Sequence, residues 1–226
     1  MRKYYLKKAF NILIIFGLII EIPFISLSIY LMDHNPPVTT LMKSREYYRK
    51  YKTKKIIYVS IYDVPELIQK ITIQIEDPAF LRHPGIHFWG IYSALLTNIR
   101  KGYGYVGGST ITQQLGKTLF LYQEKTIFRK LLDIQLAITM DLFLTKDRIY
   151  ELYLNYIEFG PGIYGIHNGS IYHFNKHISE LTKEESVILV TLISSPIRYN
   201  RKTFKKSRLL GIRYRHIMRF IERNNL

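Results

Sequence analysis

Two short blocks of the sequence carry residue types that could do chemistry together. In the first block, Glu76 and Asp77 form a carboxylate pair that lies close in sequence to His83. The second block, residues 107–117, is a glycine-rich turn that opens a helix and carries Lys117 two turns in. A proton acceptor beside a turn that favours anions suggests group transfer on a phosphorylated substrate.

A helix is predicted to end at the carboxylate pair. Asp63, followed three residues later by Glu66, has the pattern of an N-cap with a capping box. Because Pro78 disfavours helical geometry at Asp77, the helix should stop at about Glu76. The negative end of the helix dipole would make a carboxylate there a better proton acceptor. The plainer alternative is a solvated carboxylate at a helix end.

The second block is predicted to form an anion-binding helix start. Gly107 and Gly108 allow a tight turn, and Thr110 with Gln113 fits a capping box. Free backbone N–H groups at such a start favour phosphate, and Lys117 lies on the same helix face as Gln113. The block is not a Walker loop, because no Gly-Lys-Ser/Thr closes it. An ordinary capped helix with a surface lysine is the alternative.

Five motifs follow one another along the chain. They are Glu76-Asp77-x-x-Phe80-x-x-His83-x-Gly85, Gly108-Ser109-Thr110-Ile111-Thr112-Gln113-Gln114-x-x-Lys117, Arg129-Lys130, Glu151-x-Tyr153-Leu154-Asn155 and Phe159-Gly160-x-Gly162-x-Tyr164-Gly165. Over roughly residues 56–200 the chain therefore resembles the peptidoglycan glycosyltransferase family, glycosyltransferase family 51. That family includes monofunctional transglycosylases and the N-terminal half of bifunctional penicillin-binding proteins. No penicillin-binding domain follows the motifs, which predicts a monofunctional biosynthetic transglycosylase.

The resemblance implies a reaction and a role for each matching residue. Family members polymerise lipid II, a disaccharide-pentapeptide on polyprenyl diphosphate, into β-1,4-linked glycan strands. Glu76 matches the base that deprotonates the acceptor's 4-hydroxyl, which attacks C1 of the donor strand with inversion as polyprenyl diphosphate leaves. Lys117 and Arg129 match basic positions near the diphosphate, and Asp133 matches a second catalytic carboxylate. The other residues predicted to bind substrate are Asp77, Phe80, His83, Ser109, Thr110, Gln113, Gln114 and Lys130.

The resemblance also implies a divalent cation such as Mg²⁺, and no organic cofactor. The sequence itself shows no dedicated metal-ligand cluster, because its seven histidines are scattered. Asp133 is the candidate ligand, as a carboxylate near the expected diphosphate.

Four positions depart from the family pattern. Asp133 stands where the family has Glu, which shortens the reach by one methylene, and precise positioning is worth about a hundredfold in rate. His87 replaces Asp, Ser93 replaces Arg and Thr118 replaces Asn. Two alternatives to an active polymerase therefore stay open. One is a weakened scaffold that binds lipid II, and the other is a glycan-cleaving lytic transglycosylase. Cleavage is disfavoured because a glycan strand offers no phosphate to a diphosphate site.

Composition favours an anionic partner. The 226 residues have a formal net charge of +16, from 33 Lys and Arg against 17 Asp and Glu, which is typical of proteins that bind nucleic acid or an anionic membrane. Residues 9–32 form a stretch long enough to cross a bilayer, so the membrane is the expected partner and nucleic acid is not. The chain contains no cysteine, which excludes disulfides and thiolate chemistry.

Residues 9–32 are predicted to be an uncleaved transmembrane anchor, with a basic cytoplasmic segment, 1–8, before it. Glu21 interrupts the anchor, and its charge would need a partner helix, protonation or local water. A basic juxtamembrane stalk, 33–55, should connect the anchor to a glycosyltransferase domain, 56–226. The resemblance implies a domain outside the bacterial cytoplasmic (inner) membrane, in contact with lipid II, the growing glycan strand, membrane lipids and other cell-wall synthesis proteins.

The expected fold is mainly α. Residues 127–144 are apolar nearly all round, which predicts a central buried helix. The basic segment from residue 198 onward has helical spacing typical of a packing helix. The family implies a lysozyme-like lobe with a smaller membrane-associated lobe, preceded by the N-terminal transmembrane helix.

Overall fold

The computed structural model describes residues 2–101, 108–122, 124 and 126–226. Within this part the chain forms ten α-helices, four short 3₁₀ turns and a single two-stranded hairpin. The predicted class, mainly α, is confirmed. The α-helices are α1 (Arg2–Asp33), α2 (Thr40–Arg49), α3 (Glu66–Glu76), α4 (Phe88–Lys101), α5 (Ile111–Leu119), α6 (Ile127–Phe143), α7 (Lys146–Tyr156), α8 (Ile166–Phe174), α9 (Lys183–Leu192) and α10 (Arg208–Arg223).

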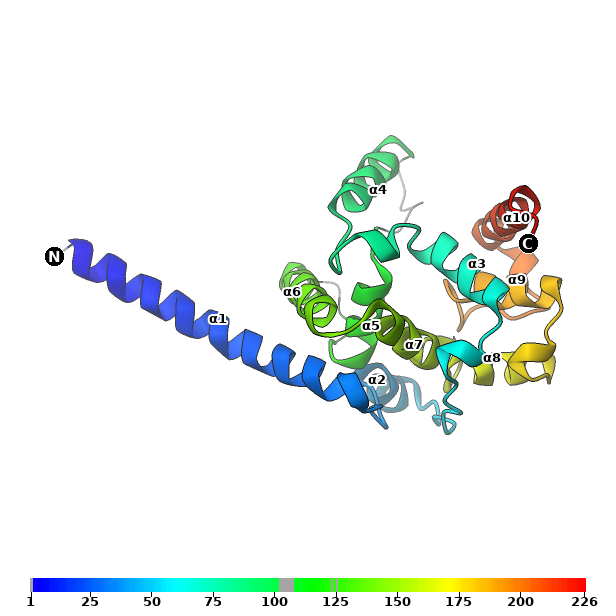
Figure 1. Cartoon of the computed structure of the whole chain (residues 1–226), viewed down its shortest axis with the longest axis horizontal. Helices are drawn as coiled ribbons and strands as arrows, with labels where there is room; N and C mark the ends of the chain where they lie inside the picture. Colours follow the sequence, from blue (N-terminus) through cyan, green and yellow to red (C-terminus); the bar gives the residue numbers. More distant parts are fainter. Residues whose placement is uncertain (1, 102–107, 123, 125) are drawn as a thin grey trace.

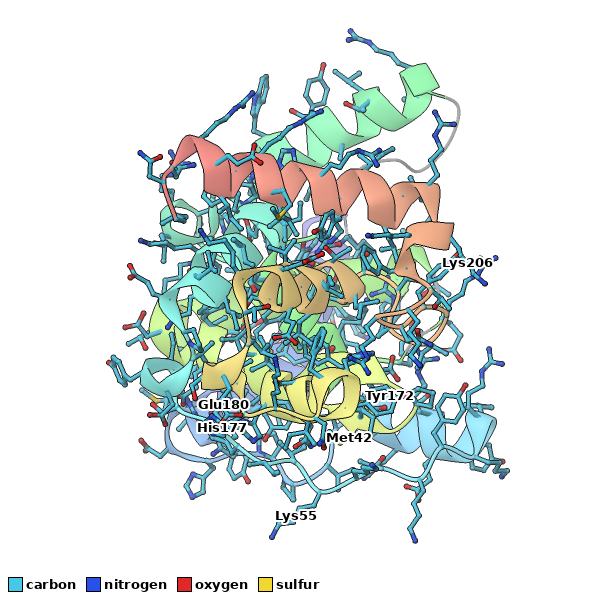
Figure 2. All side chains as sticks on the ribbon, turned by 90° about the vertical axis from the view of Figure 1, so that its right-hand side faces the viewer. Met42, Lys55, Tyr172, His177, Glu180 and Lys206 are labelled. Carbon is cyan, nitrogen blue, oxygen red and sulfur yellow. The ribbon has the colours of Figure 1, made fainter. Side chains whose placement is uncertain are left out.

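Helices α5 and α7 lie at the centre of the body and pack on each other (Figure 1). On one side, α3, α9 and α10 pack together as a second group, and Figure 2 shows α10 lying above α9. On another side, α8 packs against α7 and against the hairpin of β1 (Glu158–Gly160) and β2 (Ile163–Tyr164). The helices that carry the sequence motifs, α3, α5, α6 and α7, are thus held by one continuous core.

The hairpin closes through a glycine that no other residue could replace without strain. β1 and β2 pair antiparallel, with Glu158 opposite Tyr164. Gly162, in the turn between them, has φ +72°, and a Cβ at this position would lie 2.2 Å from the carbonyl oxygen of Lys52. The turn therefore needs glycine both for its left-handed backbone and for the close approach of residue 52.

The N-terminal helix α1 extends away from the body (Figure 1), and its last turns pack on α6. Phe24 and Leu31 of α1 are buried in this contact region. Among the residues that the structure describes, no helix is both long and apolar enough to cross a membrane. The anchor over residues 9–32 stays a prediction.

Glu21 of α1 has partners within this chain, on helix α6. Thr139 donates its hydroxyl to Oε1 of Glu21 at 2.6 Å, and the side-chain amide of Gln135 donates to Oε2. Both donors lie on α6, one helical turn apart, so they bind the two oxygens of one carboxylate. The structure thus gives the Glu21 carboxylate two neutral hydrogen-bond donors on α6, and its pairing with another membrane helix stays a prediction.

Part of the segment expected to be a stalk is built into the core. Leu41 and Met42 of α2 are buried, and the Thr40 hydroxyl donates to the carbonyl of Leu119 at 3.0 Å. Arg45 adds two hydrogen bonds of 3.0 Å to the carboxylate of Glu158, which is itself buried. The packed body therefore begins before residue 56.

Two predicted helix features are wrong in part. Helix α3 ends at Glu76 as expected, but it begins at Glu66 after Pro65, and Asp63 belongs to a separate 3₁₀ turn, Ile61–Asp63. Pro65 fixes a suitable φ and needs no N–H donor, so it starts the helix without a side-chain cap.

Helix α6 is not buried all round, because it packs on α1, α5 and α7 from part of its circumference only. The apolar residues that α6 exposes are Ile127, Phe128, Leu131, Ile138 and Leu142.

Candidate active site

Glu76 lies at the last residue of α3 and is held on both carboxylate oxygens. Gln114 of α5 donates its amide to Oε2 at 3.0 Å, and Arg213 of α10 forms an ion pair with Oε1. Tyr153 of α7 donates its hydroxyl to the other end of the Gln114 amide at 3.3 Å. Burial, then the charge of Glu76, raises the pKa of Tyr153 well above its usual value, so this hydroxyl stays a donor. Four helices thus fix the orientation of one carboxylate.

Asp77 leaves the helical geometry, with φ −159° and ψ 78°, and turns its carboxylate away from solvent. Its Oδ2 lies 2.9 Å from Nε2 of His83 and accepts the backbone N–H of Ile111 at 3.1 Å. Ile111 is the first residue of α5, so Asp77 binds the helix start that the sequence assigns to a phosphate. Asp77 and His83 are both buried and together join the first motif to the second.

Phe80 is the buried aromatic residue of the first motif. Its ring is buried and lies 5.9 Å from the ring of Tyr150, with the ammonium of Lys146 4.8 Å from its centroid. A cleft of about 450 Å³ is lined by Pro78, Ala79, Arg82, His83 and His87. The structure therefore puts the first motif partly into the core and partly along an open cleft.

The second motif begins α5 with the predicted capping box. Thr110 is the N-cap, and its hydroxyl accepts the N–H of Gln113 at 3.1 Å. In return, the Thr110 N–H donates to the side-chain oxygen of Gln113 at 3.2 Å. The Thr110 hydroxyl also donates to the carbonyl of Gly85 at 2.6 Å. Ser109 is exposed, Lys117 is half-buried, and Gly107 of the predicted turn lies outside the described residues.

Gly85 lets the loop after the first motif lie directly on α6. Its φ is +78°, and a Cβ would meet the carbonyl oxygen of Ala137 at 2.2 Å. With glycine there, the Gly85 carbonyl reaches Thr110 and the loop connects the two motifs to α6.

A second charged group lies on the first turns of α6. The ammonium of Lys130 is 2.9 Å from Oδ2 of Asp133, and Nη1 of Arg129 is 3.9 Å from the same oxygen. Arg129 also donates from Nε to the carbonyl of Glu124 at 2.8 Å. Oδ1 of Asp133 and Nη1 of Arg129 are buried and form no hydrogen bond in the described structure. Buried polar groups without partners are rare, so these atoms are available for a ligand.

Asp133 is the candidate metal ligand of this group. In the described ranges, no three or more His, Cys, Asp and Glu side chains are grouped so that they could hold a metal ion. Asp133 does leave Oδ1 without a partner. One carboxylate oxygen fits a Mg²⁺ ion that takes most of its other ligands from substrate phosphates and water.

The structure thus collects five of the predicted residues into two groups. Glu76 and Gln114 form the first, Asp133, Lys130 and Arg129 form the second, and α5 packs against α6 between them.

Arg213 was missed by the sequence analysis. The available signal was its spacing, because it lies three residues after Leu210 and four before Ile217, on the buried face of α10.

The fourth motif has a structural role in this arrangement. Glu151 accepts bonds from Tyr58, Arg148 and the N–H of Ile61, and Asn155 pairs with both backbone groups of Val59. The motif therefore fastens the segment before α3 to α7.

Comparison with known proteins agrees with these motifs. A biosynthetic peptidoglycan transglycosylase of Nitrosomonas eutropha is 31% identical over 215 residues, covering 91% of this chain and 88% of that protein. Penicillin-binding protein 1A of Aquifex aeolicus is 42% identical over 147 residues, covering 65% of this chain and 20% of that protein. Penicillin-binding protein 1F of Bacillus subtilis is 39% identical over 142 residues, covering 63% of this chain and 20% of that protein.

The chain therefore spans about a fifth of the length of these two penicillin-binding proteins. The model of one family, described as transglycosylase, matches residues 43–219, which is most of the sequence. The match covers α3, α5, α6, α7 and most of α10, and it includes both charged groups of the candidate site. The chain belongs to the transglycosylase family.

Proposed function

We propose that this chain is a glycosyltransferase that polymerises lipid II into β-1,4-linked glycan strands and releases polyprenyl diphosphate, in cell-wall biosynthesis. The observation that carries the proposal is the fixed carboxylate of Glu76, held by Gln114 from the helix that opens with the second motif. The printed names of the relatives, a biosynthetic peptidoglycan transglycosylase and penicillin-binding proteins, support the same substrate class.

In the proposed reaction Glu76 accepts the proton of the acceptor sugar's 4-hydroxyl. The hydroxyl oxygen attacks C1 of the donor strand from the face opposite the diphosphate, the C1–O bond to the diphosphate breaks, and the configuration inverts. The leaving group is already an anion, so it needs electrostatic stabilisation more than it needs a proton. The hydrogen bond from Gln114 supports this role, because the amide orients the carboxylate through Oε2 without giving it a proton.

Positive charge for the diphosphate is available on α5 and α6. Lys117 of α5 and Arg129 and Lys130 of α6 are the proposed contacts. Asp133 holds Lys130 in place through Oδ2 and would bind a divalent cation through Oδ1. When bound, such a cation would supply further neutralisation of the diphosphate charge.

Membrane contact is part of the proposal because the substrate is a lipid. Helix α4 exposes Phe88, Trp89, Tyr92 and Ile99, and α6 exposes Ile127, Phe128 and Leu142. Large exposed apolar side chains in such numbers mark interaction surfaces, and aromatic residues are typical of the membrane interface. Residues 9–32 are proposed as an anchor with a cytoplasmic N-terminus and the remaining chain outside the cytoplasmic membrane.

The test uses the full chain in detergent with labelled lipid II, and resolves products by length. Glu76→Gln keeps the size and the bond to Gln114 but cannot accept a proton, so polymerisation should fall by about 10²–10⁴-fold. Binding of the phosphoglycolipid moenomycin, as a mimic of the donor, should persist. Near-normal polymer from Glu76→Gln would remove Glu76 as the base.

The same assay separates the alternatives. A scaffold would bind the donor mimic and yield no polymer from the unmodified chain. A lytic enzyme would shorten preformed glycan and make no strand from lipid II. Either outcome would overturn the proposed polymerase.

A further inference from the structure

Helix α10 has one charged residue on its buried face. Leu210, Ile217 and Ile221 are buried against the body, and Arg213 lies on the same face at helical spacing. Arg215, two residues on, is exposed. A charged side chain that turns inward from an amphipathic helix needs a partner, because burial of an unpaired charge is costly.

The partner of Arg213 is the proposed base. Its Nη2 forms the ion pair with Oε1 of Glu76 and lies 3.4 Å from the carbonyl oxygen of Val190. The side chains of Arg213 and Glu76 are only 15% and 10% exposed, so solvent screens this pair little. It is therefore not a surface salt bridge of the kind that contributes little.

The other titratable groups named around Glu76 are uncharged or direct their charge elsewhere. Tyr150 and Tyr153 of α7 interact electrostatically with Glu76, and burial raises the pKa of both, which keeps their hydroxyls neutral. Asp77, the next residue, carries a like charge but directs it to His83 and to a backbone N–H. Arg213 supplies the opposite charge.

Burial disfavours a charged carboxylate, and a guanidinium in contact favours it. A general base must be ionised before it can accept a proton. We infer that Arg213 is a positioning residue that keeps Glu76 ionised and, together with Gln114, fixes the carboxylate for the acceptor hydroxyl. The inference rests on the proposed function, in which Glu76 is the base, and adds α10 to the machinery that controls it.

The test is the pH profile of lipid II polymerisation for the full chain and for Arg213→Gln, Arg213→Lys and the matched control Arg215→Gln. In Arg213→Gln, loss of the positive charge should move the acid limb of the rate up by about one to three pH units. The rate should recover as the pH rises. Arg213→Lys keeps the charge, so its acid limb should coincide with that of the unmodified chain even where its rate is lower. Arg215→Gln should leave the profile unchanged.

Two results would overturn the inference: an unmoved acid limb in Arg213→Gln, or an equal shift in Arg213→Lys. Thermal unfolding of Glu76→Gln, Arg213→Gln and the double variant gives a second readout that does not need activity. If the two residues interact, the double variant should be more stable than the sum of the single effects predicts, whereas additive effects would contradict the pairing.

Failure of this inference can be told apart from failure of the proposed function. Near-normal polymer from Glu76→Gln would remove the base itself. An inactive Glu76→Gln combined with an unmoved acid limb in Arg213→Gln would retain the base and remove only the role of Arg213.

Discussion

The ammonium of Lys130 lies 2.9 Å from Oδ2 of Asp133, while Nη1 of Arg129, four residues before Asp133 on the same helix, lies 3.9 Å from that oxygen. Lys130 is therefore the closer counter-ion of Asp133. Arg129 donates from Nε to the carbonyl of Glu124, and its Nη1, the nitrogen that lies 3.9 Å from Asp133, is buried without a hydrogen bond. Asp133 is only 4% exposed, so its charge is tightly coupled to both cations.

The first prediction concerns this carboxylate. Asp133→Asn removes the charge at constant shape and leaves two cations without their counter-ion, so polymerisation should fall by at least about tenfold. Asp133→Glu restores the residue expected from the family and should retain activity. Rates with lipid II, measured beside thermal unfolding, check both variants. Lys130→Met removes the partner of Asp133 together with a proposed diphosphate contact, so its activity should fall as well. Full activity in Asp133→Asn would contradict any functional role.

The second prediction concerns the diphosphate. Lys117→Ala and Arg129→Ala should each weaken binding of moenomycin by about ten- to a hundredfold, because each removes a charge-assisted contact. Lys206→Ala is the control, since Lys206 is exposed at the outer edge of the molecule (Figure 2). The measurement is a binding titration at fixed ionic strength. Equal losses at all three positions would show that the effect is general surface charge.

The third prediction concerns the contact between α1 and α6. Glu21→Leu removes the acceptor of Thr139 and Gln135, so the unfolding free energy should fall by about 1–3 kcal/mol. Glu21→Gln keeps one acceptor oxygen and should be affected less. Asp33→Asn, an exposed acid at the end of the same helix, is the matched control. Thermal unfolding in detergent checks the series, and a midpoint for Glu21→Leu equal to that of Asp33→Asn would contradict the contact.

Local signals in the sequence predicted much of the fold, and long-range contacts account for what they missed. The end of α3 before Pro78 and the capping box of Thr110 and Gln113 depend on neighbours within four residues, and both are confirmed. Which partner takes the N–H of Ile111 depends on where Asp77 lies in space. The sequence predicted that free N–H groups at this helix start favour phosphate, and in the folded chain the N–H of Ile111 donates to the carboxylate of Asp77.

The same distinction explains the site. Glu76 and Gln114 belong to recognisable motifs, but their hydrogen bond joins residues 38 apart, and the ion pair with Arg213 joins residues 137 apart. No local pattern gives such a pairing. Helix α6 was misjudged for a related reason, because periodicity describes how apolar a helix face is and does not say whether another element covers it.

The last prediction is a pH dependence of stability that arises from Glu151. Burial alone would raise the pKa of this carboxyl, but the N–H of Ile61, the hydroxyl of Tyr58 and the guanidinium of Arg148 together hold it below its usual value of 4.5. A carboxyl whose pKa is depressed by folding stabilises the folded state above the unfolded-state pKa. That contribution is lost as the pH falls through the lower, folded-state value.

The difference in unfolding free energy between the unmodified chain and Glu151→Gln should therefore be constant above about pH 5.5 and shrink progressively below about pH 4.5. Denaturant unfolding at a series of pH values measures it, with Glu222→Gln, an exposed position on α10, as the control. If the difference instead grew as the pH fell, the carboxyl would be stabilised in its protonated form. The network of Tyr58, Arg148 and Ile61 around it would then not act as a charge-stabilising clamp between α7 and the segment that precedes α3.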